Sequence, residues 1–453
     1  MNSNQNTNAL GTASIPKLLA KLAVPTVIAQ IINMLYNIVD RIYIGHIPNI
    51  GSSALTGVGL FVPILMLINA FAMLAGAGGA PLAAIAMGKQ DKEKAEHILG
   101  NCFTLLLFFA LILTFAFYMG APTLLKLFGA SDATLPFALD YARIYIAGSI
   151  FVFIVMGMNP FITTQGFTKI SMLTTVIGAL LNIILDPIFI FVLGLGVKGA
   201  AIATILSQAV GATWILLFLK GKKTNLRLKL NFMKLNPKIF LPCLGLGIST
   251  FVMMSTESLL SVSFTSSLAR FGGDIAVGSM TIITSVFMLL TMPLQGICQG
   301  AQPILSYNFG ADNKDRVKKT FYLELAVCMT YAIIFWVICM FVPHVFTGIF
   351  TNDKALVEYA SWALRIYMAA MFAMGAQNTC QQSFMALGQA KISLFLAVLR
   401  KLILLIPFIF ILPFFFENKV FAVFLAEPIS DLIAATVTTI AFFTQFNKIL
   451  NKK

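Results

Sequence analysis

Apolar residues fill most of the chain in long runs, and short polar segments separate these runs. Twelve runs reach about 20 residues, the length that a helix needs to cross the hydrocarbon core of a bilayer. They cover residues 16–43, 54–87, 98–121, 136–164, 170–194, 199–219, 238–268, 275–308, 320–347, 359–386, 392–415 and 419–446. In lipid, a helix satisfies its backbone hydrogen bonds within its own segment. The pattern therefore predicts an all-α integral membrane protein with twelve transmembrane helices.

The second half of the chain repeats the first half at an offset of about 222 residues. APLAAIAMGKQDKEK around Pro81 matches QPILSYNFGADNKDR around Pro303 in its proline, its glycine and the charged residues that follow. GFTKIS (166–171) and GQAKIS (388–393) share this offset, and ATILSQAVGAT from Ala203 pairs with AEPISDLIAAT from Ala426 one residue further along. Because six helices return the chain to the same side, we expect two six-helix bundles related by a pseudo-twofold axis along the membrane normal.

Positive charge is concentrated on alternate connections between the predicted helices. The chain has 31 Lys and Arg against 17 Asp and Glu, a formal net charge of +14. Basic connections mark the cytoplasmic side of a membrane protein, so the distribution argues against nucleic acid and predicts that both termini are cytoplasmic. The predicted parts are a polar tail (1–14), an N-lobe (15–219), a basic cytoplasmic linker (220–238), a C-lobe (239–447) and a basic tail (448–453).

Composition excludes several other classes. Hydrophobic residues make up 59% and charged residues 11% of the chain, and the mean hydropathy is +0.90, far from the values of soluble domains. The six cysteines lie in predicted helices without a CxxC spacing and are interpreted as packing residues. The sequence has no P-loop and no pattern of a nucleophile with its base. We therefore expect no enzyme, no bound cofactor and no transport driven by ATP hydrolysis within this chain.

Five segments together resemble the MATE family of multidrug and toxin extrusion transporters. They are YNIVDRIYIG, GAPLAAIAMGKQDKEKA, LLNIILDPIFIF, LRKLILLIPFIFILP and AEPISDLIAA, and they follow the expected order over nearly the whole chain. The resemblance is closer to the DinF-like and MepA-like branch than to the NorM branch. It implies export of cationic or amphipathic compounds, driven by the inward flow of protons or sodium ions.

The first predicted helix carries a polar stripe inside its apolar run. Steps of three, four and three residues place four polar side chains on one face, namely Gln30, Asn33, Asn37 and Asp40. Tyr36 lies one turn before Asp40. Such a stripe cannot face lipid, and desolvation at this depth favours the protonated carboxyl, so Asp40 is a candidate to load and release a proton. Alternatively, Asp40 lies near the helix end, paired with Arg41 and wetted by the outer interface.

The fifth predicted helix places Gly178, Asn182 and Asp186 at four-residue intervals, followed by Pro187. Proline frees a backbone carbonyl one turn earlier, so several oxygens could converge on a hard cation, and Thr204 of the sixth helix could add its hydroxyl. Alternatively, Asp186 hydrogen-bonds its own backbone at the kink, and Thr204 bonds back to its own helix.

The resemblance gives these residues a shared role. In the resembled family, an acidic residue of helix 1 with Asn, Asp and Thr of helices 5 and 6 forms the cation site of the N-lobe. The matching positions here are Asp40, Asn182, Asp186 and Thr204. Oxygen ligands admit either H⁺ or Na⁺, so the sequence leaves the coupling ion open.

The second half of the chain contains weaker candidates for cation-binding and drug-binding residues. Glu257 resembles the seventh-helix glutamate of the NorM branch, but helix 10 lacks the aspartate of that branch and offers Gln377 instead. We treat four residues as possible drug-binding positions, namely Glu257, Met73, Met288 and Gln377, because flexible Met suits a pocket for varied apolar cations. A buried structural role for Glu257 is an equal alternative.

Arg400 falls inside the eleventh predicted span and needs a partner there. Asp431 and Glu427 of the twelfth span are the available carboxylates. We predict a structural ion pair, which by itself says nothing about transport.

The sequence thus predicts a secondary active multidrug exporter of the bacterial inner membrane, a monomer that exchanges drugs for H⁺ or Na⁺ by alternating access. One alternative is a flippase for lipid-linked sugars or polyprenyl lipids, which should line its cavity with several cations. Another is a membrane channel or a scaffold that transports nothing.

Overall fold

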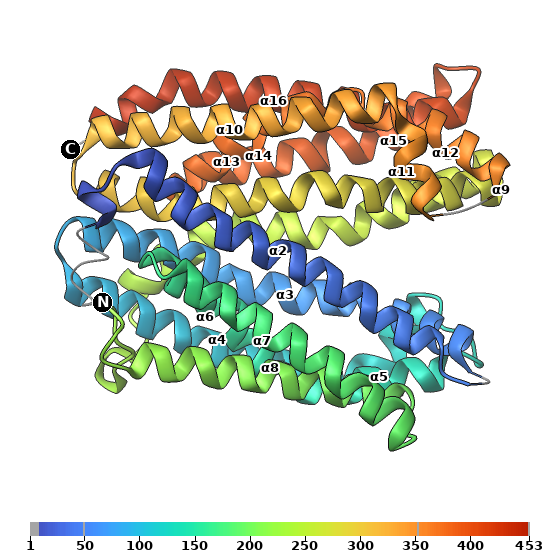
Figure 1. Ribbon diagram of the computed structural model, residues 1–453, viewed down its shortest axis with the longest axis horizontal. Helices are drawn as coiled ribbons and strands as arrows, with labels where there is room; N and C mark the ends of the chain where they lie inside the picture. Colours follow the sequence, from blue (N-terminus) through green and yellow to red (C-terminus); the bar gives the residue numbers. More distant parts are fainter. Residues whose placement is uncertain (1–8, 49, 351–352, 452–453) are drawn as a thin grey trace.

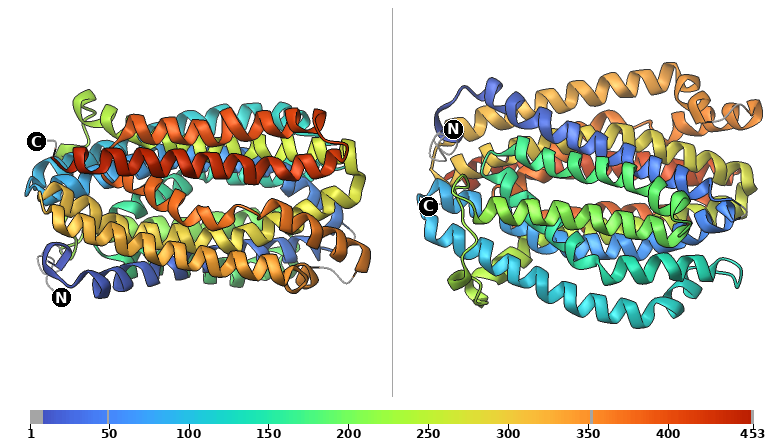
Figure 2. Two further views of the ribbon diagram at one scale, coloured as in Figure 1. Left: turned by 90° about the horizontal axis from the view of Figure 1, so that it is seen from above. Right: turned by 60° about the horizontal axis from the view of Figure 1, so that its bottom comes forward.

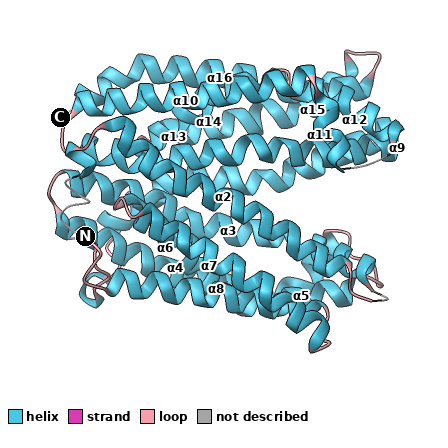
Figure 3. Cartoon of the chain, viewed as in Figure 1, coloured by secondary structure: helices cyan, strands magenta, loops and turns pink. Residues whose placement is uncertain are grey.

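The computed structural model describes residues 9–48, 50–350 and 353–451, and all regular secondary structure in these ranges is helical (Figure 3). The first half contains α2 (Ile15–Gly45), α3 (Gly51–Gly88), α4 (Lys92–Leu127), α5 (Leu135–Ala147), α6 (Ser149–Thr164), α7 (Thr168–Pro187) with the π-helix η1 (Ile188–Val192), and α8 (Val197–Lys220). The short η2 (Leu230–Phe232) lies in the following linker.

The second half begins with α9 (Pro237–Gly310), α10 (Lys314–Phe341), α11 (Pro343–Phe350) and α12 (Lys354–Tyr367). It continues with η3 (Met371–Ala373), α13 (Met374–Ala386), α14 (Ala390–Val398), the π-helix η4 (Leu399–Leu405), α15 (Ile406–Ile411), η5 (Leu412–Phe414) and α16 (Lys419–Asn451).

The helices supply twelve membrane crossings. Among the described residues, ten helical spans are long and apolar enough to cross a bilayer, and α5 with α6, bent by 57°, adds an eleventh. The long α9 supplies two of the ten, because its backbone turns at Gly273 with φ of 64°, a conformation that glycine adopts readily. We assign the twelfth crossing to α12 with α13, because this pair lies about 222 residues after α5 with α6 and is its counterpart in the repeat. The predicted all-α fold with twelve transmembrane helices is confirmed.

Several predicted spans differ in detail from single regular helices. The span 136–164 divides at Gly148, and the span 359–386 divides where η3 joins α12 to α13. The span 392–415 contains η4, a stretch of wider helical turns. Hydrophobic periodicity locates a membrane crossing, but it carries little signal for a local change of helical pitch.

The crossings form two bundles that lie side by side (Figures 1 and 2). The N-lobe consists of α2 to α8, coloured blue to green, and its buried apolar side chains form one core that also receives residues from both ends of α9. The C-lobe consists of α9 to α16, coloured yellow to red, with two further apolar cores. The predicted two-bundle architecture is confirmed.

The lobes meet closely near the end of the molecule at which the two termini lie (Figure 1). There, Thr26 Oγ1 of α2 donates to Gly296 O of α9 at 2.5 Å. Gly88 of α3 lies against the backbone of Tyr307, and Gly310 lies against that of Ile85, so these glycines let two backbones touch. Towards the opposite end, α2 and α9 diverge in Figure 1.

Candidate functional site

A buried polar cluster in the N-lobe joins α7 and α8. Asn182 and Asp186 lie one turn apart on α7, and Thr204 lies on α8, which packs against it. The amide nitrogen Nδ2 of Asn182 donates to Asp186 Oδ1 at 3.2 Å and to Thr204 Oγ1 at 3.3 Å. All three residues are buried, with Asp186 wholly inaccessible. The amide thus fixes the orientation of the aspartate and leaves its own oxygen free.

Asp40 of α2 completes this cluster. Its carboxyl group lies close to that of Asp186. Two ionised carboxylates offer only acceptors and repel each other, so a proton or a cation between them would stabilise this arrangement. In the described part of the chain, Asp40 Oδ1, Asn182 Oδ1 and Asp186 Oδ2 are buried and have no hydrogen-bond donor. The N-lobe therefore presents a group of unsatisfied oxygens with a chemistry suited to H⁺ or a small hard cation.

Aromatic hydroxyls line this cluster, and the sequence analysis missed two of them. Tyr141 and Tyr145 lie one turn apart on α5 with their rings stacked at 5.9 Å between centroids. Tyr141 lies next to Thr204, and Phe61 of α3 packs on both rings. Tyr36 of α2 lies close to both carboxyl groups. The i, i+4 spacing of the two α5 tyrosines within an apolar span was the available signal.

The four polar residues of the α2 stripe have different hydrogen-bond partners. Gln30 donates across the lobe interface to Gln299 of α9 at 3.1 Å. Asn37 bonds back to the carbonyl of Asn33 at 2.6 Å and is exposed. Asp40 at the end of the stripe lies near Asp186 of α7, so the residues of one helical face have partners in different lobes.

The described residues show no ion pair between Asp40 and Arg41, whose side chain is exposed. The contact between Asp40 and Asp186 places the carboxyl in the helix bundle. The structure therefore favours the interior location over the alternative of a residue wetted at the helix end.

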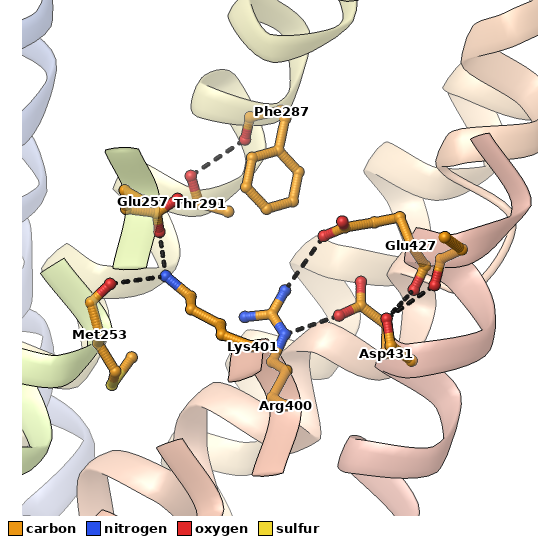
Figure 4. A network of polar contacts seen from close by, with 10 residues as sticks. Met253, Glu257, Phe287, Thr291, Arg400, Lys401, Glu427 and Asp431 are labelled. Carbon is orange, nitrogen blue, oxygen red and sulfur yellow. Dashed lines mark hydrogen bonds and ion pairs between the residues drawn. The ribbon is translucent and has the colours of Figure 1, made fainter. Parts of the chain in front are cut away.

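A second polar network lies within the C-lobe (Figure 4). Lys401 of η4 forms an ion pair with Glu257 of α9 and also donates to the carbonyl of Met253 at 2.8 Å. The lysine is buried, whereas the glutamate side chain is 53% exposed. The sequence analysis missed Lys401, although it follows Arg400 directly in LRKLILL. Glu257 is thus neutralised by a cation of its own chain.

Arg400 lies deeper in the same network. Its Nε donates to Asp431 Oδ1 at 2.7 Å, and its Nη2 lies 3.5 Å from Glu427 Oε1. Both acids lie on α16, four residues apart, and both are buried. The structure brings together the three residues that the sequence analysis grouped.

The other possible drug-binding residues are dispersed. Met288 of α9 is 41% exposed, and Met73 of α3 is half-buried. Gln377 of α13 is buried, and its Oε1 has no donor among the described residues. No hydrogen bond in the described part of the chain joins Gln377 to Glu257, so the structure does not assemble these four residues into one pocket.

Other metal or disulfide chemistry finds no support in the described residues. No group of three or more His, Cys, Asp or Glu in them could hold a metal ion, and the six cysteines are free and buried.

Comparisons with known proteins agree with this fold. The MatE family model matches residues 25–188 and 249–411. The multidrug export protein MepA of Staphylococcus saprophyticus is 26% identical over 431 residues, 94% of each chain, and MepA of Staphylococcus aureus is 25% identical over 427 residues, 93% of each chain.

Solved structures of MATE proteins also match. A crystal structure of MATE in the bent conformation and an outward-facing multidrug resistance MATE transporter each align with a TM-score of 0.91 at 24% identity, over 98% of both chains. At this identity the structural likeness supports the fold, while the family model covers well over half of the chain. The chain belongs to the MATE family of membrane transporters.

Proposed function

We propose that this protein is a secondary active multidrug exporter that exchanges cationic or amphipathic drugs for H⁺ or Na⁺. The observation that carries the proposal is the contact between Asp40 and Asp186, surrounded by unsatisfied buried oxygens. The matched relatives are named multidrug export proteins, and they cover the chain almost completely. A transporter driven by an ion gradient needs an ion site of this kind inside a lobe.

Cation binding in the N-lobe can change the arrangement of the two lobes through α2. Asp40 lies on α2, and the same helix contacts α9 of the C-lobe through Thr26 and Gln30. Without a proton or cation, Asp40 and Asp186 repel each other, so α2 and α7 separate. With a cation bound, the two helices are held together. The charge state of the N-lobe thereby shifts α2, and α2 transmits this shift to the lobe interface.

We place the protein in the bacterial inner membrane as a multi-pass monomer with both termini in the cytoplasm. The basic linker 220–238 and the two termini lie at the same end of the molecule, which fits the distribution of positive charge. The close lobe contacts at this end then correspond to an arrangement that is closed towards the cytoplasm.

The test is drug efflux from proteoliposomes under proton and sodium gradients that are imposed separately. Asp40→Asn removes the ionisable carboxyl and keeps its size, so we expect gradient-driven efflux of a fluorescent cation to be lost, while the protein still folds. Asp132→Asn, in an exposed loop, is the matched control and should transport normally. Efflux by Asp40→Asn at the wild-type rate under both gradients would refute the coupling role.

The flippase alternative has no specific support in the described residues. A pyrophosphate group needs unpaired cations, whereas Arg400 and Lys401, the cations of the deep C-lobe network, are both bound to carboxylates.

A further inference from the structure

The deep C-lobe network contains more acid than base. Lys401 and Glu257 form one pair at its edge, and Arg400 is shared between Glu427 and Asp431 (Figure 4). Three carboxylates therefore face two permanent cations. If every acid is ionised, one negative charge has no counterpart.

No other described side chain supplies the missing positive charge. The ionisable groups that face Glu427 and Asp431 from the packed helices are Glu257 of α9, Arg400 and Lys401 of η4, and Tyr367 of α12, which is neutral. The segments α13, α15, η3 and η5 also pack on α16 and carry no Asp, Glu, Lys or Arg. An unbalanced charge in the interior of a membrane protein is strongly unfavourable, so a cation or a proton is required to balance it.

Unsatisfied oxygens identify where the balancing cation binds. Each acid uses one oxygen for Arg400, and the second oxygens, Glu427 Oε2 and Asp431 Oδ2, are buried without a hydrogen-bond donor. The two side chains lie on one face of α16 and are 3% and 0% exposed. Pro428 lies between them and lacks an N–H, so the carbonyl of Phe424 has no helical donor. Two buried carboxyl oxygens and the carbonyl oxygen of Phe424 are therefore candidate ligands on this part of α16.

We propose that the C-lobe binds one monovalent cation, a proton or a sodium ion, between Glu427 and Asp431. The site is separate from the N-lobe cluster, since it lies on α16 and is completed by Arg400 of η4. It does not depend on Asp40 acting as the coupling residue. In the repeat, Glu427 occupies the position of Thr204, so both lobes place an oxygen ligand at the same point of their sixth helix.

The proposal predicts a cation effect that survives removal of the N-lobe site. The starting protein, called the background below, is the full-length chain in detergent with both Asp40→Asn and Asp186→Asn. Two test variants add either Glu427→Gln or Asp431→Asn to this background. The matched control adds Glu417→Gln, at an exposed residue of the same lobe. Thermal melting is compared in sodium and in choline at equal ionic strength and alkaline pH. The carboxylic-acid C=O stretch is measured by infrared spectroscopy without sodium.

The two ions give different results. If sodium is the ligand, it raises the melting temperature of the background and of Glu417→Gln, and this shift is lost in Glu427→Gln and in Asp431→Asn. If a proton is the ligand, sodium has no effect, and part of the carboxylic-acid band of the background is lost in the same two variants.

Two results would overturn the proposal. The first is that the background and both neutral variants show the same sodium response and the same carboxylic-acid band. The second is that both neutral variants fail to fold, because the proposal requires that loss of one negative charge replaces the bound cation.

Discussion

The N-lobe and the C-lobe both carry carboxylates within their helix bundles, but these carboxylates have different partners. In the N-lobe, Asp40 and Asp186 contact each other and have no basic partner among the described ion pairs. In the C-lobe, Glu257, Glu427 and Asp431 each contact a Lys or Arg. This difference is why we propose the N-lobe as the coupling site, whereas the C-lobe carboxylates are already held by Lys and Arg side chains of the chain.

The repeat shows how the two halves of the chain diverged. About 222 residues after Gly178 stands Arg400, and at the same offset Asn182 is matched by Leu404. Asp40 is matched by Val262, which is 65% exposed. One copy therefore kept small and polar residues that leave room for an ion, whereas the other filled the equivalent space with a guanidinium and an isobutyl group.

The largest effect is expected from Arg400→Met, which removes the fixed cation of the C-lobe. Glu427 and Asp431 then lose their shared partner, and breaking a buried ion pair in this way costs ~3–5 kcal/mol. The melting temperature in detergent should fall strongly. Arg41→Met, at an exposed position of α2, serves as the control and should change it little. An unchanged melting temperature for Arg400→Met would show that the C-lobe does not depend on its cation, and the comparison between lobes would lose its basis.

An intermediate effect is expected from Asn182→Ala in the N-lobe. The change removes one candidate ligand oxygen and the amide that orients Asp186, which together should weaken cation binding by ~1–2 kcal/mol. The proton or sodium concentration that gives half-maximal efflux should then rise about tenfold. Asn378→Ala, on α13 of the C-lobe, is the matched control. Equal shifts in the two variants would mean that the N-lobe amide has no special role.

The smallest effect is expected from Tyr141→Phe. The change keeps the stacked ring and removes only the hydroxyl next to Thr204, so the loss should be about 0.5–1.5 kcal/mol if this hydroxyl donates a hydrogen bond to the cluster. Half-maximal efflux should require a few times more of the coupling ion, with little change in melting temperature. Tyr118→Phe, an exposed tyrosine on α4, should leave both quantities unchanged. A large fall in melting temperature for Tyr141→Phe would indicate a purely structural hydroxyl.

Sequence patterns were sufficient for the fold because lipid imposes a simple length requirement on each helix. They were also sufficient to group Asn182 with Asp186, because these residues lie one turn apart on a single helix. They could not show that Tyr141 of α5 reaches Thr204, or that Lys401 reaches Glu257, since these contacts join helices far apart in the chain. Gln30 and Asp40 share one face of α2, yet their partners belong to different lobes, and periodicity says nothing about what lies opposite a face.

The π-helix η4 places two consecutive cations where each serves a different carboxylate. Removing one residue from 399–405 would restore the regular α-helical turn and rotate the following helix by ~100° relative to the preceding one. Lys401 could then no longer reach Glu257 while Arg400 stayed on Asp431. The C-lobe should therefore tolerate substitutions around η4 far better than insertions or deletions there, so the length of this segment is under stronger constraint than the identity of its apolar residues.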